Sequence, residues 1–104
     1  MNFSLLHNTP FALLVWYVRE GHEDEAKVFP GLATWHAATQ TVEVRNKQSG
    51  DVMVTLEGEQ LDRIMEVTED LKETLCQCDY GISLTMGDLS DENSDRLEKL
   101  AIQW

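Results

Sequence analysis

The chain has 104 residues, 42% of them hydrophobic and 26% charged, which predicts a single globular domain over residues 1–104 and leaves no room for two cores. Its net charge of −11 disfavours direct binding to nucleic acids and to anionic membrane surfaces. The sequence has no apolar run of the roughly 20 residues that span a membrane and no secretory signal, and its two cysteines are close neighbours, so we expect a cytoplasmic protein.

The negative charge is concentrated in the second half of the chain. Residues 1–50 hold four basic and five acidic side chains, whereas residues 51–104 hold four basic and fourteen acidic ones. Such a surface keeps a protein soluble, and it also attracts basic partners. The charge of residues 51–104 is compatible with either role.

Residues 11–18 are apolar throughout and rich in β-branched and aromatic side chains, which favours a strand buried on both faces. A helix is the alternative, because Thr9 could cap it, Pro10 suits its first position and Gly21 could end it. The charged segment that follows, residues 22–31, is predicted to be an exposed excursion.

A β-hairpin is the clearest local pattern. Apolar and polar residues alternate in residues 41–45 and again in residues 52–56, and the polar segment 46–51 between them offers Gly50 for a positive φ angle. Alternation with period two predicts one buried and one exposed face. The first strand is expected to reach back as far as Thr34.

Residues 59–76 are predicted to form an amphipathic helix. One stripe at helical spacing is apolar and consists of Leu61, Ile64, Met65, Thr68, Leu71 and Leu75. The opposite stripe is acidic and consists of Glu59, Asp62, Glu66, Glu69, Asp70 and Glu73. The acidic stripe is either the solvated back of the helix or a row of carboxylates offered to a basic partner. Few basic residues interrupt it, although like charges four residues apart repel each other.

The last third of the chain predicts a strand at residues 82–86 and a helix that Ser90 caps. One face of this helix carries Leu97, Leu100, Ala101 and Trp104. Together the segments predict an α+β fold in which a three- to four-stranded, mostly antiparallel sheet has two helices packed on one face. Because residues 11–18 would then have one uncovered apolar face, we also expect a homodimer.

Residues that could support chemistry are few. Cys76 and Cys78 could bind a soft metal or form a disulfide if the helix has ended there, but they are better interpreted as packing residues. His36, next to Trp35, could act as a base in a pocket, yet the local sequence supplies no partner for it. The sequence has no phosphate-binding loop, nucleophile elbow or metal motif, so we expect no cofactor, no metal and no enzymatic activity.

The favoured hypothesis is a non-catalytic binding or regulatory module that contacts a basic protein through the acidic helix face. A domain that binds a small molecule between sheet and helices, with Trp35 and His36 in its pocket, is the first alternative. A small enzyme built around His36 or the pair of Cys76 and Cys78 is the second, and an inhibitor that imitates a nucleic acid is the third.

Overall fold

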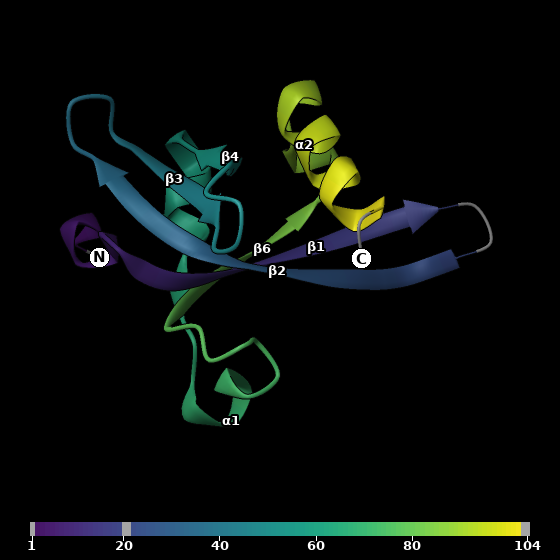
Figure 1. Ribbon diagram of the computed structural model, residues 1–104, viewed down its shortest axis with the longest axis horizontal. Coiled ribbons are helices and arrows are strands. Elements are labelled where there is room, and N and C mark those ends of the chain that lie inside the picture. Colours follow the sequence, from purple (N-terminus) through teal and green to yellow (C-terminus); the bar gives the residue numbers. More distant parts are fainter. Residues whose placement is uncertain (1, 20–21, 103–104) are drawn as a thin grey trace.

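The computed structural model describes residues 2–19 and 22–102 and contains one six-stranded mixed sheet in the order β4-β3-β2-β1-β6-β5 (Figure 1). Its strands are β1 (Thr9–Arg19), β2 (His22–His36), β3 (Thr41–Asn46), β4 (Val52–Leu56), β5 (Met65–Glu66) and β6 (Tyr80–Thr85). Its helical segments are η1 (Phe3–Leu6), η2 (Gly58–Arg63), α1 (Glu69–Lys72), η3 (Met86–Asp88) and α2 (Asp91–Ile102).

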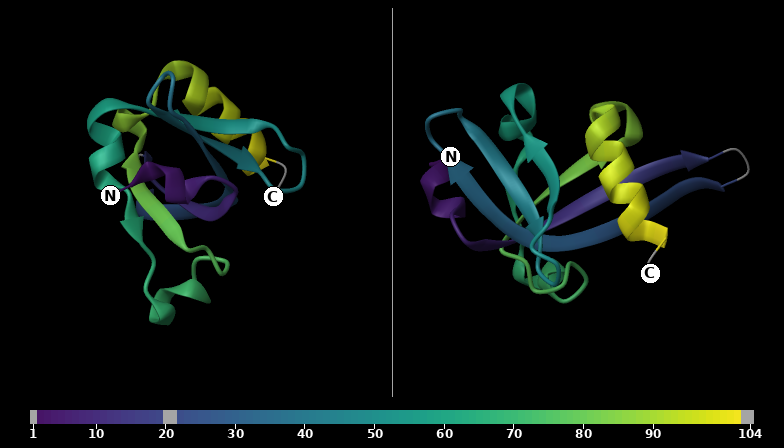
Figure 2. Two further views of the ribbon diagram at one scale, coloured as in Figure 1. Left: turned by 90° about the vertical axis from the view of Figure 1, so that its left-hand side faces the viewer. Right: turned by 45° about the horizontal axis from the view of Figure 1, so that its top comes forward.

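The predicted α+β class is confirmed, but the predicted number of strands and the predicted placement of the helices are wrong. The sheet has six strands instead of three or four, and it is mixed because β1 and β6 are parallel. The two helices do not share a face: Figures 1 and 2 show α2 and α1 on opposite sides of the long β1–β2 hairpin.

The first third of the chain forms that hairpin. β1 confirms the strand predicted for residues 11–18, and the helix alternative is wrong. The excursion predicted for residues 22–31 is also wrong, because these residues belong to β2 and pair with β1, with Leu13 opposite Phe29. An 11-residue apolar strand needs a partner of similar length to satisfy its backbone hydrogen bonds, and the charged start of β2 supplies that partner.

The second predicted hairpin is confirmed as β3 and β4, in which Val44 pairs with Val54. Gly50 in the connection has a φ angle of 75°. The expected extension of β3 back to Thr34 is wrong, because a turn at residues 37–40 separates β3 from β2, and the two strands then pair side by side.

The main core lies on the inner face of the sheet, which we define by Phe11, Leu13 and Val15 of β1. These side chains are fully buried, together with Phe29, Ala33, Val42, Val44, Val54, Leu56 and Leu84 from the neighbouring strands. The segments that cover the inner face add the buried side chains of Leu6, Leu61, Ile64 and Leu97. The opposite face, here called the back face, carries Ala12, Leu14 and Trp16 of β1.

The single helix predicted for residues 59–76 is wrong. The chain instead forms η2, then β5 at the edge of β6, then the one-turn helix α1. The apolar residues of this segment serve two different faces of the sheet. Ile64 joins the inner core, whereas Val67 lies near Gly81 on the back face. A straight helix cannot cover both faces of one sheet, so the chain becomes extended at residues 64–68 and passes around the sheet edge.

The C-terminal segments agree with the sequence pattern. Ile82 and Leu84 of β6 are buried, as alternation predicted. Ser90 caps α2, since its Oγ accepts a hydrogen bond from the backbone N–H of Asn93 at 3.2 Å. Leu97 is buried, whereas Trp104 and the side chains of Leu100 and Ala101 lie outside the part of the chain that the structure describes.

Candidate functional site

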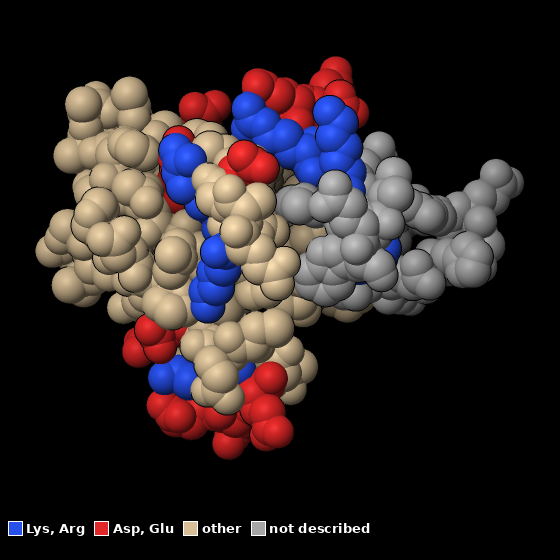
Figure 3. All heavy atoms as spheres, in the orientation of Figure 1, with Lys and Arg blue, Asp and Glu red and all other residues tan. Residues whose placement is uncertain are grey.

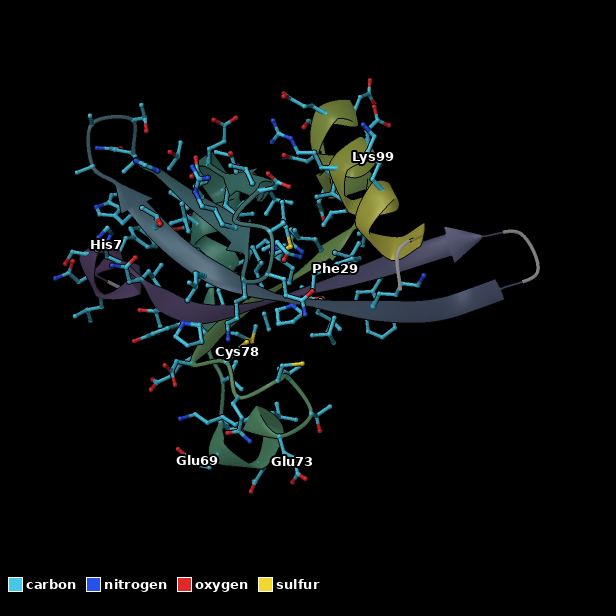
Figure 4. All side chains as sticks on the ribbon, viewed as in Figure 1. His7, Phe29, Glu69, Glu73, Cys78 and Lys99 are labelled. Carbon is cyan, nitrogen blue, oxygen red and sulfur yellow. The ribbon has the colours of Figure 1, made fainter. Side chains whose placement is uncertain are left out.

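The segment between β5 and β6 projects from the back face as a small lobe. We call residues 65–79 the acidic lobe, because it holds Glu66, Glu69, Asp70, Glu73 and Asp79 against one lysine, Lys72. Figure 3 shows these charges gathered around α1, and Figure 4 shows Glu69 and Glu73 at the end of the lobe that lies away from the sheet.

Backbone contacts hold the lobe to the sheet at its base. The N–H of Val67 donates to the carbonyl of Asp79 at 2.8 Å, and the N–H of Asp79 donates to the carbonyl of Pro10 at 3.0 Å. Near its end the lobe turns back through Cys76 and Gln77, whose φ angles of 60° and 61° lie in the left-handed region. The lobe is therefore a folded feature with a fixed position on β1 and β6.

Lys72 forms ion pairs with two of the five carboxylates of the lobe. The Nζ atom of Lys72 lies 3.0 Å from Oε1 of Glu69 and 3.4 Å from Oδ1 of Asp79. These contacts raise the pKa of Lys72, and the hydrogen bond that Lys72 donates to Glu69 is the largest cause. Glu66, Asp70 and Glu73 are exposed, and no ion pair joins them to a basic side chain of the described residues. They remain available to an external cation.

An apolar groove of about 150 Å³ lies between the lobe and the back face. Its lining comes from β1, from the lobe and from β6, namely Ala12, Leu14, Met65, Glu66, Val67, Leu71, Leu75, Gly81, Ile82 and Ser83. Met65 and Leu71 are 59% and 49% exposed, so they extend the apolar area of the groove onto the surface. The site therefore combines exposed apolar area with unpaired carboxylates.

The structure divides the predicted acidic stripe into two parts. Glu66, Glu69, Asp70 and Glu73 stay together on the lobe, but Glu59 and Asp62 belong to η2, which packs on the inner face through Leu61. A single helix face with all six carboxylates does not exist. The prediction failed because the apolar stripe satisfied helical spacing while its members pack on opposite faces of the sheet.

Trp35 and His36 do not line one pocket. They are successive residues of β2, so their side chains point to opposite faces. Trp35 packs against Phe3 with ring centroids 5.1 Å apart, on the core side. His36 is exposed on the other face, where its Nε2 lies 3.8 Å from the carboxylate of Glu43, which also contacts Arg45 at 2.5 Å. The pairing of β2 with β3 brings Glu43 to His36, and the local sequence gave no sign of this contact.

The two cysteines have different surroundings. Cys76 is exposed and Cys78 is fully buried at the base of the lobe (Figure 4). The Cys78 thiol donates to the carbonyl of Cys76 at 3.9 Å, and burial raises its pKa. Within the described residues, no three His, Cys, Asp or Glu side chains converge on a point where a metal ion could bind.

Sequence reasoning missed a second, polar cleft. It has a volume of about 290 Å³ and lies between β4, η2 and the start of α2, lined by Thr55, Glu57, Gln60, Asp88, Ser90, Glu92, Asn93 and Arg96. Several of these groups are already paired with one another. Gln60 donates to the carbonyl of Asp88 at 2.8 Å, and Arg96 contacts Glu92 at 2.5 Å. The cleft is therefore the place where β4, η2 and α2 meet, and several of its polar groups already bind one another.

Comparison of the chain with protein-family models, with curated proteins and with solved structures finds no match. In the described part of the chain, no helix is long and apolar enough to cross a membrane. A functional assignment therefore depends on the geometry and charge of the surface described above.

Proposed function

We propose that this protein is a non-catalytic protein-binding module and that the acidic lobe contacts a basic protein. The observation that supports this function is the distribution of charge on the lobe. Five carboxylates share one lysine, and Glu66, Asp70 and Glu73 form no ion pair with a basic side chain of the described residues. Lysine or arginine side chains of a partner would relieve this repulsion, and they would be drawn to the lobe before contact.

The lobe supports this role better than the other acidic surface. Glu59 and Asp62 lie on η2 beside Arg63, which contacts Asp88 at 3.1 Å, so that surface carries its own basic group. The cleft beside η2 has a polar lining, in contrast to the apolar groove beside the lobe. An interface needs a desolvated apolar centre as well as a charged rim.

Affinity capture with two matched variants tests the proposal. The lobe variant is Glu66→Gln, Glu69→Gln, Glu73→Gln, and the control variant is Glu57→Gln, Glu59→Gln, Asp62→Asn, which changes the residue that precedes η2 and two residues of η2. Both remove three negative charges and alter no buried side chain. Lysate of the source organism is passed over each immobilised protein at low salt. The captured protein is then purified, and its affinity for each variant is measured by calorimetry.

We expect a basic protein that binds the wild type and the control variant, and binds the lobe variant at least tenfold more weakly, since about 1.5 kcal/mol is lost with three interfacial charges. Binding should weaken as salt is added. Equal loss with both variants would show that net charge alone governs capture and would refute the assignment to the lobe. Loss with the control variant alone would place the interface on η2.

A further inference from the structure

The groove between the lobe and the back face has the size of one large side chain. Its volume of about 150 Å³ matches that of engineered apolar cavities that bind benzene. Leu14 of β1 lies on the sheet side, Val67 and Leu71 lie on the lobe side, and Met65 stands at the rim. The groove thus has room for a phenyl ring or a branched aliphatic side chain.

A glycine keeps this groove open. Gly81 lies opposite Ala12 in the sheet, and both line the groove. A Cβ atom at position 81 would lie 3.1 Å from the Ala12 carbonyl oxygen and 3.6 Å from Cγ2 of Val67. Because Ala12 and Gly81 are both small and lie side by side, while the residues around them are larger, a hollow remains above them.

The rim of the groove is acidic. Glu66 lines both the apolar groove and an adjoining hollow of about 310 Å³, which Thr68, Glu69 and Lys72 also line. An apolar ligand that enters the groove therefore comes within reach of carboxylates. This charge opposes anionic ligands, and it opposes a second copy of a chain whose net charge is −11.

We propose that the groove binds a single aromatic or branched aliphatic side chain of the partner, flanked in the partner's sequence by lysine or arginine residues that contact Glu66 and the other unpaired carboxylates of the lobe. This inference rests on the proposed function and adds the chemistry of the segment that the partner presents. The apolar side chain supplies the buried centre of the contact, and the basic residues supply its charged rim.

Three defined peptides test the proposal by fluorescence anisotropy. Each peptide carries the fluorescent label at its N-terminus. The first is Gly-Lys-Arg-Phe-Arg-Lys-Gly. The second has alanine in place of the phenylalanine, and the third keeps the phenylalanine and has glutamate in place of every basic residue. We expect the phenylalanine peptide to bind about tenfold more tightly than the alanine peptide, since it alone buries a ring. The glutamate peptide should not bind.

Variants of the groove sharpen the test. Met65→Ala, Leu71→Ala removes two exposed side chains from the rim and the wall, so it should reduce binding of the phenylalanine peptide to the level of the alanine peptide. Leu5→Ala, which truncates a 62% exposed leucine of η1 away from the groove, should leave binding unchanged. Far-ultraviolet circular dichroism checks that both variants stay folded.

The outcomes separate this inference from the proposed function. If the phenylalanine and alanine peptides bind equally and the lobe variant weakens both, the groove proposal is overturned and the basic-partner proposal stands. If neither peptide binds, the groove proposal is overturned, and the captured partner alone decides the function of the lobe. If sedimentation shows a wild-type dimer that Met65→Ala, Leu71→Ala dissociates, the groove is a contact between two copies of this chain, and the proposal is wrong.

Discussion

The two faces of β1 start from the same kind of sequence and end in different surroundings. Phe11, Leu13 and Val15 on the inner face are fully buried beneath the helical segments and the strands that curve over them. On the back face, Leu14 is half-buried and Trp16 is 36% exposed, although both are large apolar residues. An apolar strand therefore indicates that both of its faces favour burial, but it does not reveal which of them the chain itself covers.

The charged residues are also distributed unequally between the two faces of the sheet. The groove on the back face is bordered by the acidic lobe, whereas the core on the inner face contains no buried polar or charged residue among those described. Carboxylates beside exposed apolar side chains keep such a surface soluble and restrict which partners can cover it. The inner face thus supplies stability, and under the proposed function the back face would supply the surface for recognition.

Truncating one leucine on each face gives the largest expected contrast. Leu97→Ala removes a fully buried side chain of α2 and should lower the free energy of unfolding by about 2 to 5 kcal/mol. Leu71→Ala removes a 49% exposed side chain of the lobe and should cost less than about 1 kcal/mol. Urea unfolding followed by tryptophan fluorescence measures both values. Similar losses for the two variants would contradict the division between the faces.

Adding a methyl group to the inner face tests how tightly it is packed. A Cβ atom at Gly31 would lie 2.5 Å from the Arg45 carbonyl oxygen and 2.6 Å from Cε of Met53, whose side chain passes over the glycine. Gly31→Ala should therefore cost about 1 to 3 kcal/mol of unfolding free energy. Gly87→Ala is the matched control, since the nearest atom, Oγ1 of Thr85, is 3.7 Å away. A Gly31→Ala protein as stable as the control would show that both the Met53 side chain and the Arg45 backbone move aside at little cost.

Local patterns predicted the elements whose side chains all serve one face. The hairpin of β3 and β4, the strand β6 and the capped helix α2 were correctly predicted, because one periodicity describes each of them. Residues 59–76 were wrongly predicted as one helix for the opposite reason. Ile64 and Leu71 belong to one helical stripe, yet Ile64 joins the inner core and Leu71 lines the groove on the back face, a long-range requirement that helical spacing does not contain.

The candidate site was predictable in part. The acidic residues that gather on the lobe, Glu66 to Glu73, could be singled out from the sequence, because their clustering is local. The groove could not be found in this way, since Ala12, Leu71 and Gly81 meet only through the parallel pairing of β1 with β6. The apolar character of residues 11–18 was its one signal in the sequence, and it predicted an uncovered face without locating it.

The smallest expected effect on stability comes from a substitution of Asp88, which lies at the edge of β6 where the two faces of the sheet meet. β5 covers β6 only at Tyr80 and Gly81, and beyond them Asp88 accepts a hydrogen bond from the N–H of Thr85 at 2.9 Å and contacts Arg63 at 3.1 Å. The backbone hydrogen bond from Thr85, followed by the bond from Arg63, lowers the pKa of Asp88 below its ordinary value of 3.8. A carboxylate with a lowered pKa in the folded state stabilises the protein above its unfolded pKa and loses this contribution as the pH falls through its folded pKa.

Because the Asp88 carboxylate is partly exposed, Asp88→Asn should lower the free energy of unfolding by only about 0.5 kcal/mol at neutral pH. The difference from wild type should shrink as the pH falls from about 5 to about 2, which urea unfolding at each pH measures. Asp62→Asn controls for the change in net charge, and a wild-type advantage over Asp88→Asn that stays constant throughout this range would exclude Asp88 as its source.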